Sequence, residues 1–449
     1  MNVAIMKTKA EQALLEAFET VQSQLPGGAS VKAARIAAMG KFNTLGLPHR
    51  RVEEYKYTDL RVAMKEALPL SIDEAAKVTI ADLIVALGPL AHVDAYRITF
   101  VNGACRADLS DLDGAAGLEV KPLSGALSGA PDKVGAGLAE TTGPGNDATV
   151  VLNTAFMTDG AVVRIAPAAK LAKPLLIVFL RGGSQSRSTA VRNIIAAGEK
   201  SEATILEAHV VVPGSSLDAQ CNALTELTVG NGSVITHIKV AVDEGKAVHL
   251  ANWNVALEAH ATYRGFQFTS NHGLVRNQIH VTYKGEYGKL DLSGAFLARG
   301  HEHIDTTLVV DHAVPHCESR ELFKGVLDGH GRGIFQGKII VRPDAQKTDG
   351  KQMAQALMLS PDAEFDSKPE LEIYADDVVC GHGTTSAQLD DDLLFYCMSR
   401  GIPEIEARAL LIDSFIGEAL DKVENEAIRE ALQAYAMQWL QFSSSKPRS

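Results

Sequence analysis

The stretch VITHIKV at residues 234–240 alternates in a way that suits an extended strand, in which Val234, Thr236, Ile238 and Val240 share one face. Residues 96–101 (YRITFV) alternate similarly and are followed by the turn dipeptide Asn102-Gly103. Comparable short runs occupy residues 162–165, 175–180, 249–256, 278–282, 306–310 and 338–341. Each is rich in β-branched or aromatic residues and is bounded by Gly, Asn or Asp. The sequence therefore predicts a mainly β protein.

These strands follow one another over more than two hundred residues, with no helical pattern of useful length between them. A sandwich, a barrel or a β-solenoid would each fit such a region. The sequence has no strict repeat, so periodicity alone does not decide among them. The length of the region favours a solenoid, because stacked rungs let a core grow in one dimension whereas a sandwich of this size would divide.

Helical periodicity appears only at the two ends of the chain. Leu14, Phe18, Val21 and Leu25 form one apolar stripe, which Pro26 ends. Near the C-terminus a second stripe comprises Ile428, Leu432, Tyr435 and Trp439. We therefore expect an N-terminal helical domain over residues 1–95, a β core over 96–388 and a C-terminal helical domain over 389–449.

The composition narrows the range of functions. The 449 residues include 55 acidic and 43 basic side chains, for a net charge of −12, which argues against nucleic-acid binding. No run of 18 apolar residues predicts a membrane span, and the first residues lack the pattern of a secretory signal. The five cysteines are sparse and contain no CxxC pair. These features predict a cytoplasmic protein with reduced thiols.

Two groups of residues could bind a metal ion. The first comprises His301, His303, His312 and His316, which would support a metal-dependent enzyme on a β scaffold if they converged in space. The second is Cys380-Gly381-His382, whose thiolate and imidazole suit zinc, iron or an iron–sulfur cluster. Cys380 and His382 are too few for a complete site, so the remaining ligands would come from another chain.

Common catalytic motifs are missing from the sequence. No GxxxxGK[ST] sequence is present, so the chain is not expected to bind ATP through a P-loop. GxSxG and HExxH are also missing. These absences argue against the commonest hydrolase classes.

Several stretches in the last third are similar to the SufD family, subunits of the SUF iron–sulfur assembly system. They are ESRELFKGV (318–326), GIFQGKI (333–339), DAQKT (344–348), KPELEIYADDVVCGHGTT (368–385), LFY (394–396), SRGIP (399–403) and ARALL (407–411). Near the N-terminus, EEYKYTDL (53–60) resembles the family's E-W-K-Y-T-D signature, with Tyr55 in the place of Trp. From the residues alone, this N-terminal stretch would be a solvated loop. The Cys380 loop resembles SufD more than its paralogue SufB.

The resemblance implies a right-handed parallel β-helix flanked by N- and C-terminal helical domains, acting as a non-catalytic scaffold. Such a subunit pairs with SufB, binds the SufC ATPase and shares a transient iron–sulfur cluster with SufB; the ATP site belongs to SufC. By the same resemblance, His382 would bind the cluster or incoming iron, and Cys380 would be a weaker ligand. A homodimer is plausible for the isolated chain. The expected SufC contacts are Ser399, Arg400, Gly401, Ile402, Pro403, Ala407, Leu411 and Phe415.

Overall fold

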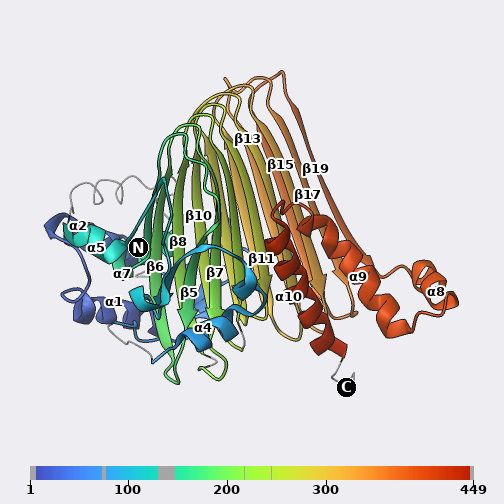
Figure 1. Cartoon of the computed structure of the whole chain (residues 1–449), viewed down its shortest axis with the longest axis horizontal. Coiled ribbons are helices and arrows are strands. Elements are labelled where there is room, and N and C mark those ends of the chain that lie inside the picture. The colour runs from blue at the N-terminus through green and yellow to red at the C-terminus, as the bar shows by residue number, and fades with distance from the viewer. Residues whose placement is uncertain (1–6, 73–76, 130–146, 217, 244, 445–449) are drawn as a thin grey trace, which may run out of the picture.

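The computed structural model of the chain describes residues 7–72, 77–129, 147–216, 218–243 and 245–444. Within these residues the strands form a ten-stranded sheet and a nine-stranded sheet, which stack to form one elongated body (Figure 1). From β4 (Ala161–Ile165) onward, strands that follow one another along the chain alternate between the two sheets, and each pairs in parallel with the strand two places further on. This is the architecture of a β-solenoid, as the sequence predicted.

The ten-stranded sheet contains β1 (Tyr96–Val101), β2 (Ala104–Cys105), β5 (Leu175–Arg181), β7 (Glu202–Val211), β9 (Val234–Val242), β11 (Thr262–Ser270), β13 (Lys289–Ala298), β15 (Glu318–Leu327), β17 (Asp349–Met358) and β19 (Val379–Gln388). The nine-stranded sheet contains β3 (Leu118–Pro122), β4 (Ala161–Ile165), β6 (Arg187–Ala197), β8 (Ala219–Val229), β10 (Val248–Leu257), β12 (Leu274–Tyr283), β14 (His303–His312), β16 (Arg332–Val341) and β18 (Glu364–Ile373). Only the pairs β1–β2 and β3–β4 are antiparallel.

The length of a rung varies along the solenoid. Partners in neighbouring strands are 26 residues apart between Val248 and Leu274, and 32 apart between Arg187 and Ala219. Loops at the turns absorb the difference, while the strands remain in register. Because the number of residues in a rung varies, the sequence of this regular solenoid has no strict repeat.

Alternate side chains point into the solenoid or away from it, and most strands are buried on both faces. In β9, Ile235 and His237 are buried inside, whereas Ile238 and Val240 are buried on the outer face. The outer face is covered by α9 (Glu404–Leu420) and α10 (Glu426–Ser444), which lie across the ten-stranded sheet (Figure 1). The C-terminal stripe of Ile428, Leu432, Tyr435 and Trp439 is therefore buried within the chain.

The N-terminal part of the chain covers the outer face of the nine-stranded sheet. It contains α1 (Lys9–Val21), α2 (Ala29–Leu45), the 3-10 turn η1 (Glu53–Tyr55) and α3 (Leu60–Ala63). Two further elements, α4 (Ile80–Leu87) and the 3-10 helix η2 (Gly88–His92), contact the C-terminal helices on the other sheet. Helix α1 ends at Val21, so Leu25, which the apolar stripe assigned to the helix, lies beyond it in the core between the helices.

The 53–60 stretch is a strap against the nine-stranded sheet and not the solvated loop that its polarity predicted. Tyr55 is 2% exposed, lies against the Arg276 guanidinium of β12 and donates a hydrogen bond to Asp147 at 2.7 Å. Thr58 contacts Asp305 and His303 of β14. The strap therefore ties residues that are more than two hundred positions apart in the sequence.

Helices also occur inside the region that the sequence suggested was strands alone. The 3-10 turn η3 (Ala107–Leu109), α5 (Leu123–Gly129) and α7 (Ala148–Phe156) all precede β4. Every residue of α7 is buried, so this helix has no amphipathic period for sequence analysis to detect. None of the described helices is long and apolar enough to span a lipid bilayer.

Candidate functional site

The end of the solenoid nearest the C-terminal helices has two strands with a free edge, β18 and β19. Strand β18 (EFDSKPELEI) carries five charged residues and Pro369, features that discourage pairing with another sheet. Strand β19 (VCGHGTTSAQ) has no Asp, Glu, Lys, Arg or Pro. Its ten residues therefore offer an unprotected edge to which a strand of another chain could add.

Cys380 and His382 lie on the inward face of β19. The inward direction follows from Thr384, two residues further on, whose hydroxyl lies 2.9 Å from that of Ser367 on the opposite sheet. His382 is exposed because no further rung covers it, whereas Cys380 is half-buried beside Ile339 and Ala345. Burial raises the pKa of the Cys380 thiol. Both side chains therefore face the open end of the solenoid.

A row of polar side chains leads from His382 back into the solenoid. His382 is in register with Gln352 of β17, which is in register with Glu321 of β15. Glu321 is 3% exposed, and its carboxylate oxygens have no hydrogen-bond partner of good geometry among the described residues. Burial raises its pKa to about 8. The row places a buried acid two strands behind the exposed imidazole.

The open end can donate an imidazole and a thiol to a metal ion. Alternate residues of a strand lie about 7 Å apart, so Cys380 and His382 can bind neighbouring atoms of a cluster more easily than a single ion. A [2Fe–2S] or [4Fe–4S] cluster needs four protein ligands. A second chain docked on the same edge would be placed to supply the others.

The structure does not bring His301, His303, His312 and His316 together. His303 points outward to Thr58, with 2.8 Å between Nε2 and Oγ1, whereas His312 is buried inside, 3.1 Å from the Ser319 hydroxyl. These two residues lie at opposite ends of β14, about 30 Å apart at 3.3 Å per residue. His301 stacks on His330 and His316 on Tyr287, each beyond a different end of the strand. One metal ion cannot reach all four.

The C-terminal segment expected to contact SufC is only partly accessible. Ser399, Arg400, Gly401 and Pro403 are exposed, and Ile402, Leu411 and Phe415 are half-buried. Ala407 is fully buried, so it cannot contact a partner in this conformation. The exposed apolar residues of the segment are Leu393, Phe395, Tyr396, Met398, Ile405 and Leu410.

Helix α8 (Asp391–Ser399) carries the first four of these residues and stands away from the sheets (Figure 1). Phe395 is 72% exposed, and Ile405 at the start of α9 is 69% exposed. Of the expected contacts on α9, Ala407 is buried against the rest of the chain, whereas Leu411 and Phe415 are half-buried. The exposed apolar residues given above were not among the expected contacts. The available signal for those on α8 was the apolar run LLFYCM at residues 393–398.

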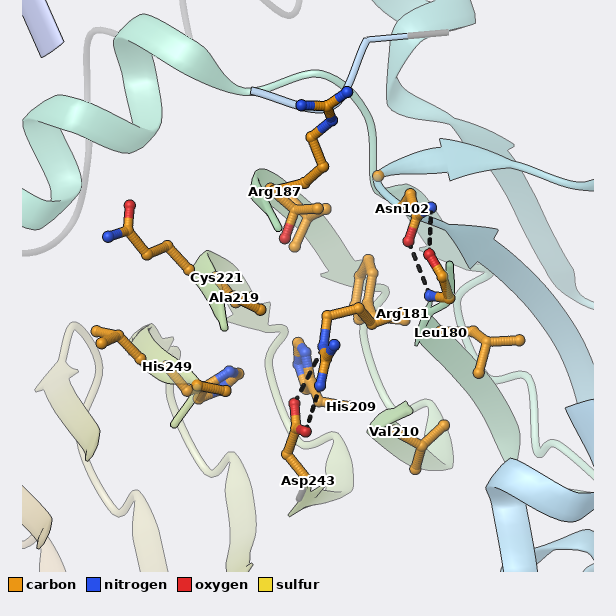
Figure 2. A pocket seen from close by; sticks show the side chains of 18 of the residues that line it. Asn102, Leu180, Arg181, Arg187, His209, Val210, Ala219, Cys221, Asp243 and His249 are labelled. Atoms are coloured by element: carbon orange, nitrogen blue, oxygen red, sulfur yellow. Dashed lines mark hydrogen bonds and ion pairs between the residues drawn. The ribbon is translucent and has the colours of Figure 1, made fainter. Parts of the chain in front are cut away.

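A further cluster escaped the sequence analysis. His209 of β7, Cys221 of β8 and His249 of β10 each offer a ligand atom, and these atoms all lie within 4.8 Å of one another. Figure 2 shows the three side chains around a cavity beside the Arg181–Asp243 ion pair. Burial lowers the pKa of His209 to about 4, so its imidazole is neutral at physiological pH. The 28-residue spacing of Cys221 and His249, one rung, was the available signal.

Comparison with known proteins gives a consistent result over nearly the whole chain. Residues 179–415 match the family model described as SUF system FeS cluster assembly, SufBD core domain. Residues 8–177 match the model of the SufBD protein N-terminal region. Together these two matches include the N-terminal helices, the solenoid, α8 and most of α9, and they end before α10.

Individual relatives agree with the family models. The chain is 30% identical over 412 residues to an iron–sulfur cluster assembly SufBD family protein of Synechocystis, covering 89% of each chain. It is 30% identical over 396 residues to the iron–sulfur cluster assembly protein SufD of Escherichia coli, covering 87% of this chain and 88% of that protein. The SufD of Bacillus subtilis is 26% identical over 286 residues, which is 63% of this chain and 64% of that protein.

Proposed function

Because the chain belongs to the SufBD family of iron–sulfur cluster assembly proteins and is a homologue of SufD, we propose that it is a non-catalytic scaffold subunit that pairs with SufB through β19. The observation that carries this proposal is the open end of the solenoid. There, an uncharged strand with a free edge presents Cys380 and His382. In this role the iron–sulfur cluster is cargo that is assembled and passed on.

Pairing through β19 would satisfy backbone groups that the solenoid leaves open. A partner strand would form main-chain hydrogen bonds along ten residues and would cover exposed apolar side chains such as Val379, which is 62% exposed. The isolated chain could use the same edge to form a homodimer, because a two-fold axis places one edge against its own copy. SufB, which the family resemblance implies has the same fold, would take the place of that copy in the assembled complex.

His382 is proposed as the chief ligand that this chain gives to the cluster or to incoming iron. Its side chain is exposed at the rim, whereas the Cys380 thiol is half-buried and protonated at neutral pH by its raised pKa. Cys380 would become a ligand when docking or motion of the partner exposes it. The other ligands would come from SufB.

The exposed apolar surface of α8 and the start of α9 is the proposed docking site for the SufC ATPase. It comprises Leu393, Phe395, Tyr396, Met398, Ile405 and Leu410. An exposed apolar surface on a projecting helix is typical of a protein interface. Assigning ATP hydrolysis to SufC agrees with the missing P-loop motif in this sequence.

Two variants test the proposal when the chain is co-expressed with SufB and SufC and purified without oxygen. Thr385→Lys places a charge on the exposed edge of β19, and we expect SufB to be lost from the purified complex. Gln355→Lys is the matched control, because Gln355 is in register with Thr385 one strand further from the edge. Equal recovery of SufB with both variants would exclude β19 as the interface.

His382→Ala tests the ligand role separately. We expect the complex to assemble at its normal stoichiometry but to yield several-fold less cluster, measured by iron and sulfide content. Thr385→Ala, a small change on the outward face of the same strand, should leave both unchanged. A normal cluster yield with His382→Ala would show that the exposed imidazole is not needed as a ligand. His382 would then have no part in the proposed function.

A further inference from the structure

A cavity of about 60 Å³ lies between the two sheets near the N-terminal end of the solenoid. Several rungs separate it from Cys380 and His382 at the other end. His209, Cys221 and His249 are among the residues that line it (Figure 2). Because a water molecule needs only about 10–15 Å³ by the same kind of measure, the cavity can hold an ion with bound water. All three side chains point inward from strands that are rigidly paired on both sides.

We propose that His209, Cys221 and His249 form a binding site for a divalent transition-metal ion such as Zn²⁺ or Fe²⁺. Two imidazoles and one thiolate are a recognised three-ligand set for tetrahedral zinc, with water in the fourth position. Zn–N distances of about 2.0 Å and Zn–S distances of about 2.3 Å require ligand atoms roughly 3.3–3.5 Å apart in a tetrahedral site. The present separations of up to 4.8 Å need only small side-chain rotations to reach that geometry.

The surroundings of the two histidines support a metal site over a packing cluster. Nε2 of His249 is buried and has no hydrogen-bond partner among the described residues, an unfavourable state that an ion would relieve. Nε2 of His209 is also buried without a hydrogen-bond partner among the described residues, and it lies 3.7 Å from a carboxylate oxygen of Glu207. An ion bound at these two atoms would satisfy buried nitrogens that the described residues leave without a partner.

The charges around the cavity are compatible with a cation bound to a thiolate. Arg181 is ion-paired with Asp243 at the mouth, so the two charges largely cancel. Lys239 is buried nearby and donates a hydrogen bond to Asn277 at 2.8 Å, while Glu207 supplies a negative charge beside His209 and His237. The charges of Glu207 and Lys239 offset one another, so a divalent ion with the Cys221 thiolate would add a single net positive charge to the cavity.

The first test uses the full-length chain, stripped with a chelator and titrated with Co²⁺ without oxygen. We expect a single ion per chain, with the thiolate-to-cobalt charge-transfer band and visible bands of a tetrahedral site, both removed by added Zn²⁺. Cys221→Ser should abolish the charge-transfer band, and His249→Ala should weaken binding by at least about tenfold. Fe²⁺ in a parallel titration should compete with Co²⁺ for the same site.

The controls separate this site from the open end of the solenoid. The double variant Cys380→Ser/His382→Ala and the single variant Cys397→Ser should retain the cobalt spectrum unchanged. Loss of the spectrum in the double variant, or its persistence in Cys221→Ser, would overturn the proposal. So would failure of the wild-type chain to bind any ion.

A second measurement on the wild-type chain does not depend on whether the variants fold. Zn²⁺ should protect Cys221 from alkylation by at least severalfold, while Cys397 on α8 should react at the same rate with and without the ion, as followed by peptide mass spectrometry. Equal alkylation of Cys221 in both conditions would contradict the assignment. Because the isolated chain is used, failure here would leave pairing through β19 unaffected.

Discussion

Glu321 is a buried acidic residue inside the solenoid, close to its open end. The residue is buried two strands behind His382, in the same inward row as Gln352. Its pKa is raised from 4.5 to about 8, chiefly by burial. The folded state therefore holds a proton on Glu321 at neutral pH, when the unfolded chain has released it.

This difference makes stability depend on pH. The contribution of Glu321 to the free energy of unfolding is fully favourable below about pH 4.5, where the carboxyl is protonated in both states. This contribution is lost as the pH rises toward 8. The unfolded chain then releases the proton freely, whereas the folded state must either keep it or bury a charge. Glu321→Gln has no proton to lose. We expect this variant to gain on the order of 3 kcal/mol relative to wild type between pH 5 and pH 8.

Thermal unfolding of the two proteins at pH 5 and pH 8 measures this change. The midpoint of Glu321→Gln should exceed that of wild type at pH 8 by clearly more than at pH 5. Glu318→Gln, an exposed acid on the same strand, serves as the control and should show no such dependence. The same midpoint difference at both pH values for Glu321→Gln would mean that burial does not shift this carboxyl.

At the scale of the element, α8 differs from α9 and α10 in what its apolar side chains do. Helices α9 and α10 bury Ile412, Ile416 and Trp439 against the sheet, whereas only Leu394 of α8 is buried. The neighbouring Phe395 and Tyr396 remain in solvent. Such residues contribute little to the stability of the chain, so their exposure is better explained by a partner.

We therefore expect Phe395→Asp to abolish binding of SufC while shifting the unfolding midpoint of the chain very little. The physical reason is that the substitution desolvates a charge only in the complex, where a buried unpaired carboxylate is costly. Binding of SufC, measured by titration calorimetry, reports the first effect. Asp392→Ala, on the same helix but outside the apolar set, is the control.

If Phe395→Asp bound SufC with unchanged affinity, the docking surface would have to be sought elsewhere. SufC would then be retained either through the mostly exposed residues 399–403 or through the half-buried Leu411 and Phe415, and the second arrangement would require α9 to move. A variant that unfolded at a markedly lower temperature would contradict the exposure of Phe395.

At the scale of the whole molecule, a solenoid is a row of rungs in which each strand contacts mainly its neighbours. Stability is then close to a sum over neighbouring rungs, and an end rung lacks one neighbour. The rung of β18 and β19 has the additional weakness that none of its residues is fully buried. The central strands β8 to β12 are paired on both edges and buried on both faces.

Hydrogen exchange followed by mass spectrometry should reveal this gradient. We expect amides of β19 to exchange at least tenfold faster than those of β10 in the isolated chain, because the end rung opens without disturbing the rest. Addition of SufB should slow exchange in β19 and leave β10 unchanged. Uniform protection along the solenoid, or slowing confined to the N-terminal rungs, would contradict both the gradient and the proposed interface.

Local patterns in the sequence were enough to determine the mainly β character and the helical ends. Alternation and helical periodicity depend on neighbours within a few positions, so they can be read directly from runs such as 234–240 and from Ile428 to Trp439. The same reasoning failed for α7, which is buried all round, and for Tyr55, whose partners lie far away in the chain.

Only the tertiary structure decided which distant residues meet. Rungs of 26 to 32 residues bring His209, Cys221 and His249 together, whereas a single extended strand keeps His303 and His312 apart although they are close in sequence. The structure also left β19 as an uncovered edge and turned Phe395, not Ala407, to solvent. Such contacts depend on strand register and loop length, which are set by packing of the whole solenoid and not by any local stretch of sequence.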